Sequence, residues 1–503
     1  MIQMISEMLA KYIRLATYPS LAAIVALSFN SSADSATAGI AQEAVLGATD
    51  TSEYAIGQPT DLATSARQEP ILVAEAAPAA PTPVVVAEAP QVDPYAKYSQ
   101  YLIKGWNINQ PDPSNFIDQD PYGIRTKMAE DGLFLYGFSN NTYTYDVRND
   151  DKLYGTAQVY SGQKSTYSSI NLAFLTYDLG KIGLPGGQFA ATLTYAYFNW
   201  APQGPTHAHL GDLKYYQTFL DGKVELTIGY LGNTVVYNGT YIGGNLAGGT
   251  FGVNASIPQE AGQTQDLVTR PAINLKLNLG NGFYNLAGIQ RSWNPGGTQA
   301  EINANGFGFG WNGRGIGELF QEEFGYQRAA APDRPFTWVR AGYAYNNSDY
   351  ASLKTPGTTS SNHYYSVLGD RQLLQLGDTA GSAYRGLYGG FTVMEAPPEV
   401  DRFSQYYELR LYMKGPLDSR PTDTVSFVVD QNRFSKYAIA IAEAQDQLTV
   451  DQATSVSLGY TANVIPGVFI TSGFSYIDHP RPVTTIPEQK SAVNFLFNVL
   501  FYW

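Results

Sequence analysis

The sequence predicts an all-β fold: a transmembrane antiparallel β-barrel of about 16 strands, with a short N-terminal helical segment before it. Three observations lead to this prediction. An export signal stands at the N-terminus, segments with a two-residue hydrophobic period fill residues 132–503, and the last strand ends in Phe501, Tyr502 and Trp503. At roughly 20 to 26 residues for each strand with its share of turns, residues 132–503 supply about 14 to 18 strands, and an even number favours 16.

Residues 1–38 have the features of a signal peptide that is removed after export. Lys11 and Arg14 form a basic region, residues 21–29 form an apolar core, and residues 36–38 (Ala-Thr-Ala) suit a signal peptidase site. The apolar core is about half as long as the roughly 20 residues that a membrane-spanning helix needs. We therefore expect cleavage rather than anchoring, and a destination in the outer membrane of a Gram-negative-type cell.

Two further segments precede the predicted barrel. Residues 39–94 are rich in Ala and Pro, which predicts a flexible linker that is partly extended as polyproline II. Residues 95–131 are mixed in composition, and we expect them to form a periplasmic or plug-like segment. Within it, residues 122–132 predict a short helix that Gly132 ends.

Alternating hydrophobicity defines the predicted barrel, residues 132–503. Residues 223–230, 336–345, 406–414 and 424–430 each have one apolar face and one polar face. A soluble β-sandwich alternates too, but its closed core would not accept charges in mid-strand, whereas a water-filled lumen does. The segment 406–414 has both features, with Tyr407, Leu409, Leu411 and Met413 on one face and Glu408, Arg410 and Lys414 on the other.

The C-terminal strand is the most specific local signal. Its alternate positions form an unbroken apolar and aromatic row, as a lipid-facing closing strand requires. Such a strand would be an aggregation hazard at the end of a soluble protein. We expect it to close the barrel and to be recognised, through Trp503, by the outer-membrane assembly machinery. The row consists of Val493, Phe495, Phe497, Val499, Phe501 and Trp503.

Composition and motifs exclude several other functions. The net charge of -13 argues against a nucleic-acid partner, and the absence of Cys excludes disulfides and thiolate metal sites. No Gly-x-Ser-x-Gly motif or other catalytic set is visible, so we expect neither an enzyme nor a cofactor. His207 and His209 have the spacing of metal ligands, but Pro205 and Gly211 flank them. We therefore expect a loop there and, without a third ligand, no metal site.

Four stretches resemble the OprB-type carbohydrate-selective porins. They are the opening segment 122–137, the strand and loop of 226–245, the hairpin of 406–430 with its Arg-Pro-Thr-Asp turn, and the late hairpin of 459–480. The resemblance implies a 16-stranded channel through which monosaccharides or other small sugars diffuse passively, among outer-membrane lipids. A porin of general or cation selectivity is the main alternative, because the chain is acidic; a barrel enzyme and a secreted lectin are the others. Monomer and homo-oligomer both stay open.

The candidate pore-lining residues follow from the alternation. Charged side chains bond sugar hydroxyls strongly, and mixed signs keep a lumen from excluding neutral solutes. The alternative for each charge is a solvated wall position away from the constriction. Trp311 and Arg314, in the Gly-rich run 306–317, are candidates if that loop folds into the pore; otherwise Trp311 is an anchor at the membrane interface. The polar faces of the strands supply Glu323, Arg340, Glu408, Arg410 and Asp430.

Overall fold

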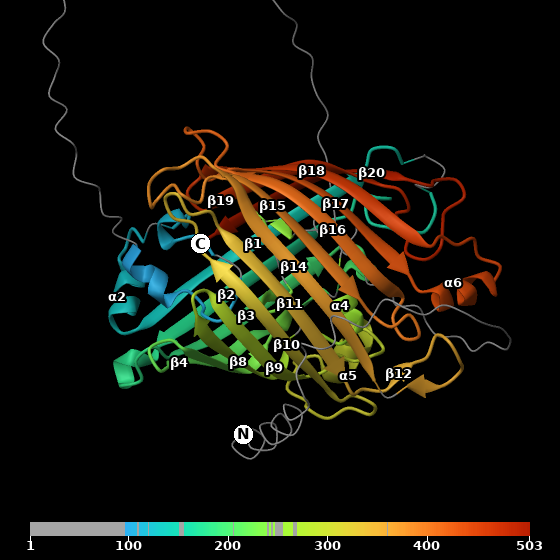
Figure 1. The fold of residues 1–503 in the computed structure, drawn as a ribbon, viewed down its shortest axis with the longest axis horizontal. Coiled ribbons are helices and arrows are strands. Elements are labelled where there is room, and N and C mark those ends of the chain that lie inside the picture. The colour runs from blue at the N-terminus through green and yellow to red at the C-terminus, as the bar shows by residue number, and fades with distance from the viewer. Residues whose placement is uncertain are drawn as a thin grey trace, which may run out of the picture.

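The protein folds into a closed antiparallel barrel of 16 strands, as the sequence predicts (Figure 1). The structure is a computed structural model that describes residues 96–503 except 108–109, 119, 150–154, 205, 239–240, 243–244, 247–254, 265–268 and 360. The predicted signal peptide and linker, residues 1–94, lie outside the described residues. No helix among the described residues is long and apolar enough to span a bilayer.

Each barrel strand pairs with its neighbours in sequence order, and the first strand pairs with the last. Two short hairpins, β6 (Tyr241–Ile242) with β7 (Asn245–Leu246) and β12 (Tyr350–Ala351) with β13 (Thr358–Thr359), stand outside this order. The barrel strands are β1 (Leu133–Asp146), β2 (Ser168–Asp178), β3 (Gln188–Phe198), β4 (His207–Phe219), β5 (Val224–Leu231), β8 (Arg270–Gly280), β9 (Phe283–Arg291), β10 (Glu318–Arg328), β11 (Thr337–Asn346), β14 (Asn362–Gln375), β15 (Gly386–Glu395), β16 (Phe403–Lys414), β17 (Thr424–Phe434), β18 (Gln452–Ile465), β19 (Val468–Ile477) and β20 (Ala492–Tyr502).

The C-terminal strand closes the barrel, which confirms the prediction made from its sequence. β20 pairs with β19 on one side and with β1 on the other, where Phe138 lies opposite Tyr502. Alternate residues differ in exposure as expected: Phe497, in the outward row, is 40% exposed, whereas its neighbour Leu496 is fully buried. A side chain at Gly137 would collide with the Trp503 indole, so this glycine makes room for the terminal ring.

The two ends of the barrel differ in the length of their connections. Tight turns such as 281–282 and 466–467 join strands at one end, whereas the connections 147–167, 232–269 and 292–317 at the other end are long. Short turns belong to the periplasmic side of outer-membrane barrels and long loops to the extracellular side. The N-terminal end of β4 and the C-terminal end of β3 are therefore at the extracellular mouth.

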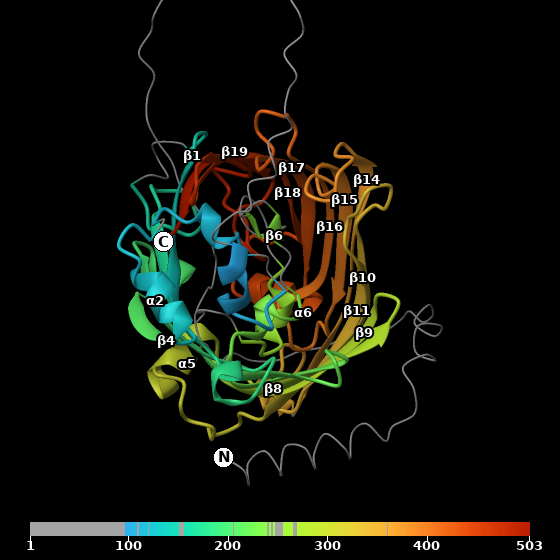
Figure 2. The same ribbon diagram turned by 90° about the vertical axis from the view of Figure 1, so that its left-hand side faces the viewer.

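The first part of the N-terminal segment, from Tyr98 to Trp106, lies inside the barrel against inward side chains of β1 to β4, whereas its last helix lies at the end of the barrel beside the start of β1 (Figure 2). Tyr136 on β1 accepts a hydrogen bond from the Ile103 amide (2.8 Å), and Thr176 on β2 donates to the Tyr101 carbonyl (2.6 Å). Its elements are η2 (Ala96–Tyr101), η3 (Pro113–Asn115) and α2 (Ile124–Glu130). The helix predicted over 122–132 is therefore confirmed as α2, and Gly132 after it has a positive φ of 87°.

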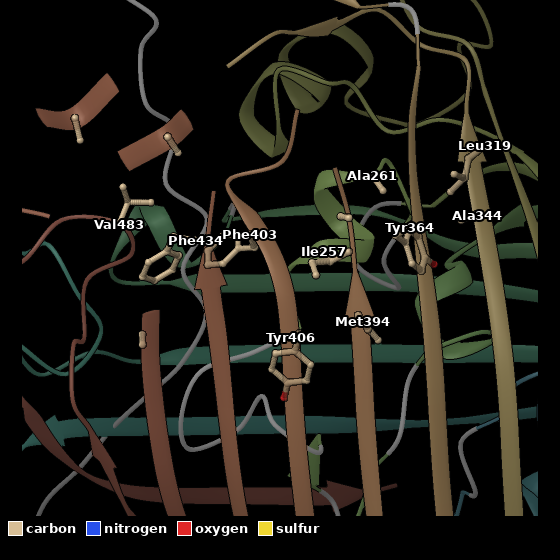
Figure 3. Packing of buried hydrophobic residues seen from close by; sticks show 14 residues of the cluster. Ile257, Ala261, Leu319, Ala344, Tyr364, Met394, Phe403, Tyr406, Phe434 and Val483 are labelled. Atoms are coloured by element: carbon tan, nitrogen blue, oxygen red, sulfur yellow. The ribbon is translucent and has the colours of Figure 1, made fainter. Parts of the chain in front are cut away.

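The connection between β5 and β8 also enters the barrel. It contains η6 (Asn233–Val235) and α4 (Ile257–Glu260), and α4 packs against inward side chains of β10 to β16 (Figure 3). Ile257 and Ala261 are fully buried there against Tyr364, Phe403 and Tyr406. The remaining helices lie in other connections: η4 (Leu179–Ile182), η5 (Ala201–Gln203), α5 (Thr298–Asn305) and α6 (Lys436–Glu443).

Candidate pore site

Arg410 is the centre of a charged network on the inner wall. Its guanidinium binds Asp370 on β14 through two hydrogen bonds, from Nε to Oδ1 (2.9 Å) and from Nη2 to Oδ2 (2.6 Å). Nη1 donates to Glu408 Oε1 (2.5 Å) and to the Thr392 hydroxyl (2.8 Å). The Arg410 side chain is fully buried, so the ion pairs offset the cost of removing the charge from water.

Tyrosine hydroxyls complete this network. Tyr406 donates to Glu408 (2.6 Å), and Tyr412 donates to Asp370 (3.0 Å). Asp430 on β17 lies opposite Glu408 in the strand register and accepts a hydrogen bond from Ser455 (2.8 Å). Three of the predicted residues, Glu408, Arg410 and Asp430, are therefore neighbours on one stretch of wall.

Arg340 and Glu323 form a second network, on β11 and β10. The Arg340 guanidinium lies 3.8 Å from the centre of the Trp338 ring and 3.7 Å from Glu323 Oε2. It also donates to the carbonyl of Tyr237 (2.7 Å), in the connection that enters the barrel. Tyr284 donates to Glu323 (2.7 Å) and accepts from the Trp338 indole (2.9 Å). Arg340 thus joins the wall to the inward-folded connection.

The five wall candidates are buried rather than solvated. Each has at most 3% of its surface exposed, and each is engaged with neighbouring polar groups. The alternative that such charges are hydrated wall positions is wrong for these residues, because side chains of neighbouring strands cover them and, at Arg340, the β5–β8 connection does so as well. The sequence pattern gave their face correctly but not their packing.

Trp311 and Arg314 are not near these networks. Both lie in the β9–β10 connection, where Arg314 is exposed and the Trp311 carbonyl accepts from Arg291 Nε (3.0 Å). Arg291 is on the outward face of β9 by alternation, since Gln290 before it is bonded to inward groups. The same connection places Phe309 against Tyr230 (5.3 Å between ring centres) on the outer face of β5. The loop folds over the outer rim, so these two residues do not belong to the lumen wall.

The opposite wall holds charged pairs that the sequence reasoning missed. Lys214 Nζ lies 2.8 Å from Asp212 Oδ2 on β4, and Lys276 lies 3.5 Å from Glu225. Trp106 of the N-terminal segment donates to Asp212 (2.7 Å), and its ring lies 5.3 Å below Lys214 Nζ. The alternation in 223–230 places Glu225 on the polar face, so this signal was available in the sequence.

The β5–β8 connection is fixed at both sides of the lumen. Near β5, Asn233 donates to Gln290 (2.9 Å). Across the barrel, Glu260 of α4 accepts from Arg402 Nε (2.8 Å) and from the Arg402 amide (2.7 Å), at the start of β16. Asp401 precedes Arg402 in the chain. Burial and the negative charge of Glu260 raise the pKa of the Asp401 carboxyl well above its usual range. The β5–β8 connection also contacts the Arg340 network, through the Tyr237 carbonyl.

His207 and His209 are on a strand, not in a loop as the sequence predicted. β4 begins at His207, and Gly211 does not interrupt the pairing because a bulge at 211–212 absorbs the glycine. Both side chains face inward, since His209 is opposite the inward residue Thr194. Among the described residues, no group of three or more His, Cys, Asp or Glu side chains is arranged to hold a metal ion.

Comparisons with known proteins agree with this architecture. The profile of the carbohydrate-selective porin, OprB family, matches residues 149–491. A structure of Pseudomonas putida OprB at high pH superposes with a TM-score of 0.66 at 18% identity, over 78% of this chain and 99% of that one. The putative porin QuiX of Acinetobacter baylyi is 25% identical over 212 residues, 39% of this chain; the match spans about half (47%) of that relative. The chain is an outer-membrane porin, not an enzyme, and it belongs to the OprB family of carbohydrate-selective porins.

Proposed function

We propose that the protein allows passive diffusion of small neutral sugars, monosaccharides above all, across the outer membrane. The family match carries this proposal. The inner wall supports it, because its ion pairs combine four cations with five carboxylates, a net charge of only -1 within a chain of -13. Because these charges are paired with one another, they leave a weak field in the lumen, and a weak field suits neutral solutes better than ions. The paired residues are Lys214, Lys276, Arg340 and Arg410 with Asp212, Glu225, Glu323, Asp370 and Glu408.

Liposome swelling and planar-bilayer recordings test this function. The reconstituted protein should admit glucose faster than a disaccharide of the same osmolarity, and glucose should reduce its ion conductance. General or cation selectivity is the competing function, motivated by the acidic total charge. A reversal potential near that of an ideal cation channel in a salt gradient, without any effect of sugar on conductance, would contradict the sugar proposal.

We further propose that residues 96–118 act as a plug that narrows the lumen. Their contacts with β1, β2 and β4 support this, and Lys104 and Gln188 add a hydrogen bond of 2.9 Å. Deleting residues 39–118 should leave a folded barrel with a higher single-channel conductance. Unchanged conductance in a folded deletion variant would contradict the role. The removal of residues 1–38 by a signal peptidase is a separate proposal, which N-terminal sequencing of the mature protein tests.

The partners proposed for the outside of the barrel are lipids, the assembly machinery and further copies of the chain. Polar residues on the outward faces of β1 and β2 support self-association: Ser169 donates to Asn141 (2.9 Å), and Asn171 donates to Ser169 (3.0 Å). Polar groups are costly against lipid unless protein covers them. Because the chain has no Cys, Asn171→Cys gives a single probe. A disulfide-linked dimer in native membranes is expected; exclusive monomer would leave the assembly proposal without support.

A further inference from the structure

Glu322 places a carboxylate on the outer, lipid-facing side of the barrel, in the middle of its wall. It is exposed on β10, whereas the next residue, Glu323, points inward and is 2% exposed. In the register it lies opposite Ala287, the central residue of β9; Figure 2 shows β9, β10 and β11 side by side. The other outward carboxylates of the barrel strands, Glu318 and Glu395, are terminal residues of their strands. A carboxylate at mid-strand against lipid is costly, so its presence calls for a partner.

The protein leaves part of this carboxylate unbonded. Within the described part of the chain, Glu322 Oε1 accepts a hydrogen bond from Asn285 Nδ2 on β9 (3.1 Å), and Oε2 accepts none. Lipid tails offer no donor to it. The open acceptor therefore indicates that a polar group from outside the barrel reaches Glu322 in the membrane.

Tyr343 supplies a matching donor on the neighbouring strand. It lies directly opposite Glu322 in the register of β10 with β11, and its ring packs against Tyr365 (4.9 Å between ring centres). Its hydroxyl has no hydrogen-bonding partner among the described residues. A donor beside an acceptor makes this face self-complementary, because a two-fold rotation sets the donor of one copy against the acceptor of another.

We propose that the outer face of β9–β11 is a two-fold contact between two copies of this chain in the outer membrane. The Tyr343 hydroxyl of each copy donates to the Glu322 carboxylate of the other, so both carboxylates gain a donor and both are withdrawn from lipid. The side chains beside them are small: Ala287 on β9 and the exposed Ala341 on β11. Small residues let two walls approach closely enough for such hydrogen bonds.

This contact is separate from the β1–β2 face and from the pore. The strands β3, β4, β5 and β8 lie between β2 and β9 in the barrel, so the two faces can be tested one at a time. The contact uses only outward side chains, and it therefore does not rest on which solute passes through the lumen.

Disulfide cross-linking of the full-length protein in native membranes tests the contact. Phe324→Cys places one thiol in the outward row of Glu322, because Phe324 is 51% exposed and the chain has no other Cys. Oxidation by copper phenanthroline should convert this variant to a dimer. Leu409→Cys is the matched control and should stay monomeric, since Leu409 is 66% exposed on the outer face of β16 with the apolar Phe391 and Val429 opposite it.

Tyr343→Phe in the Phe324→Cys background separates the contact from folding. It removes a hydroxyl that bonds no described residue, so the folded fraction, measured by heat-modifiable migration, should not change. The dimer yield should fall roughly five- to tenfold, because the contact loses two equivalent hydrogen bonds in the membrane. Glu322→Leu should lower the yield as well, whereas Tyr407→Phe on the outer face of β16 should leave it unchanged.

Three results would overturn the proposal. The first is a dimer yield for Phe324→Cys no higher than for Leu409→Cys. The second is an unchanged yield in both Tyr343→Phe and Glu322→Leu, which would mean that the faces meet without this pair. The third is a cross-link that forms only between Phe324→Cys and Asn171→Cys copies, which would assign the β9–β11 face to the β1–β2 face of the next copy. Glucose swelling rates measure the pore function separately from all three.

Discussion

Replacing Arg410 by Met tests whether the inner-wall charges are buried as the structure places them. The substitution keeps most of the side-chain volume but removes every hydrogen bond that the guanidinium makes to Asp370, Glu408 and Thr392. Two carboxylates then remain on the wall without their cation. Asp370 keeps the Tyr412 hydroxyl and Glu408 keeps the Tyr406 hydroxyl, which donate one bond each.

The expected loss of stability follows from this burial. Removing one partner of a buried ion pair costs about 3–5 kcal/mol, because the other charge stays in a low-dielectric environment without compensation. Arg410→Met should therefore lower the free energy of unfolding by this amount at neutral pH. The loss should shrink when Asp370→Asn is added, because one of the two uncompensated carboxylates is then removed.

Urea unfolding in detergent, followed by Trp fluorescence and by heat-modifiable migration, measures the effect. Arg433→Met on the neighbouring strand β17 is the matched control. Arg433 is exposed on the outward face above the Tyr407 ring (5.8 Å), so its loss should cost under about 1 kcal/mol. Equal, small effects of the two substitutions would refute the reasoning, since they would mean that water reaches Arg410 and its carboxylates as freely as it reaches Arg433.

Three other predictions follow from the same geometry. Arg340→Ala should change glucose swelling rates, because the Tyr237 carbonyl loses its donor and the inward connection loosens; rates equal to those of the native protein and of Arg433→Ala would remove Arg340 from the pore site. Because the pKa of Asp401 is raised in the folded state, its contribution to stability is full below its ordinary pKa of about 3.9 and is lost as pH rises through the folded value. Asp401→Asn should therefore flatten the decline of the unfolding midpoint with rising pH, and an unchanged slope would contradict the burial of this carboxyl. Gly137→Leu should impair folding by displacing the Trp503 ring, which the folded fraction in gels reports, whereas Gly381→Leu, which meets no neighbour, should fold.

The sequence was sufficient to predict the barrel and to predict which residues of each strand share a face, because alternation of apolar and polar residues is a local property. In β16, Tyr407, Leu409 and Leu411 are exposed outward while Glu408 and Arg410 are buried inward, as their order along the chain predicts. The C-terminal row was readable for the same reason. Length bounded the number of strands at about 14 to 18, since each strand must cross the same membrane thickness, and the preference for an even number favoured 16.

The side chains that bind these inward residues could not be predicted from alternation. Asp370 binds Arg410 from a strand two positions away, and Gly390 between them leaves the space that the guanidinium needs. That pairing depends on the registers of β14 with β15 and of β15 with β16, which no single segment specifies. Alternation therefore found Arg410 as a candidate but could not identify Asp370.

Connections were the least predictable part because they have no repeating pattern that fixes a direction. The loop of Trp311 folds outward, and what holds it there is a buried cluster in which Glu301 binds both Arg270 (2.6 Å) and Arg291 (2.8 Å). These residues are far apart in the sequence, and each looks like an ordinary strand or loop charge. The β5–β8 loop folds inward because Glu260 reaches the free amides at the start of β16. In both loops one carboxylate satisfies groups that would otherwise be buried alone, so the direction of each loop is decided by where the unpartnered donors lie.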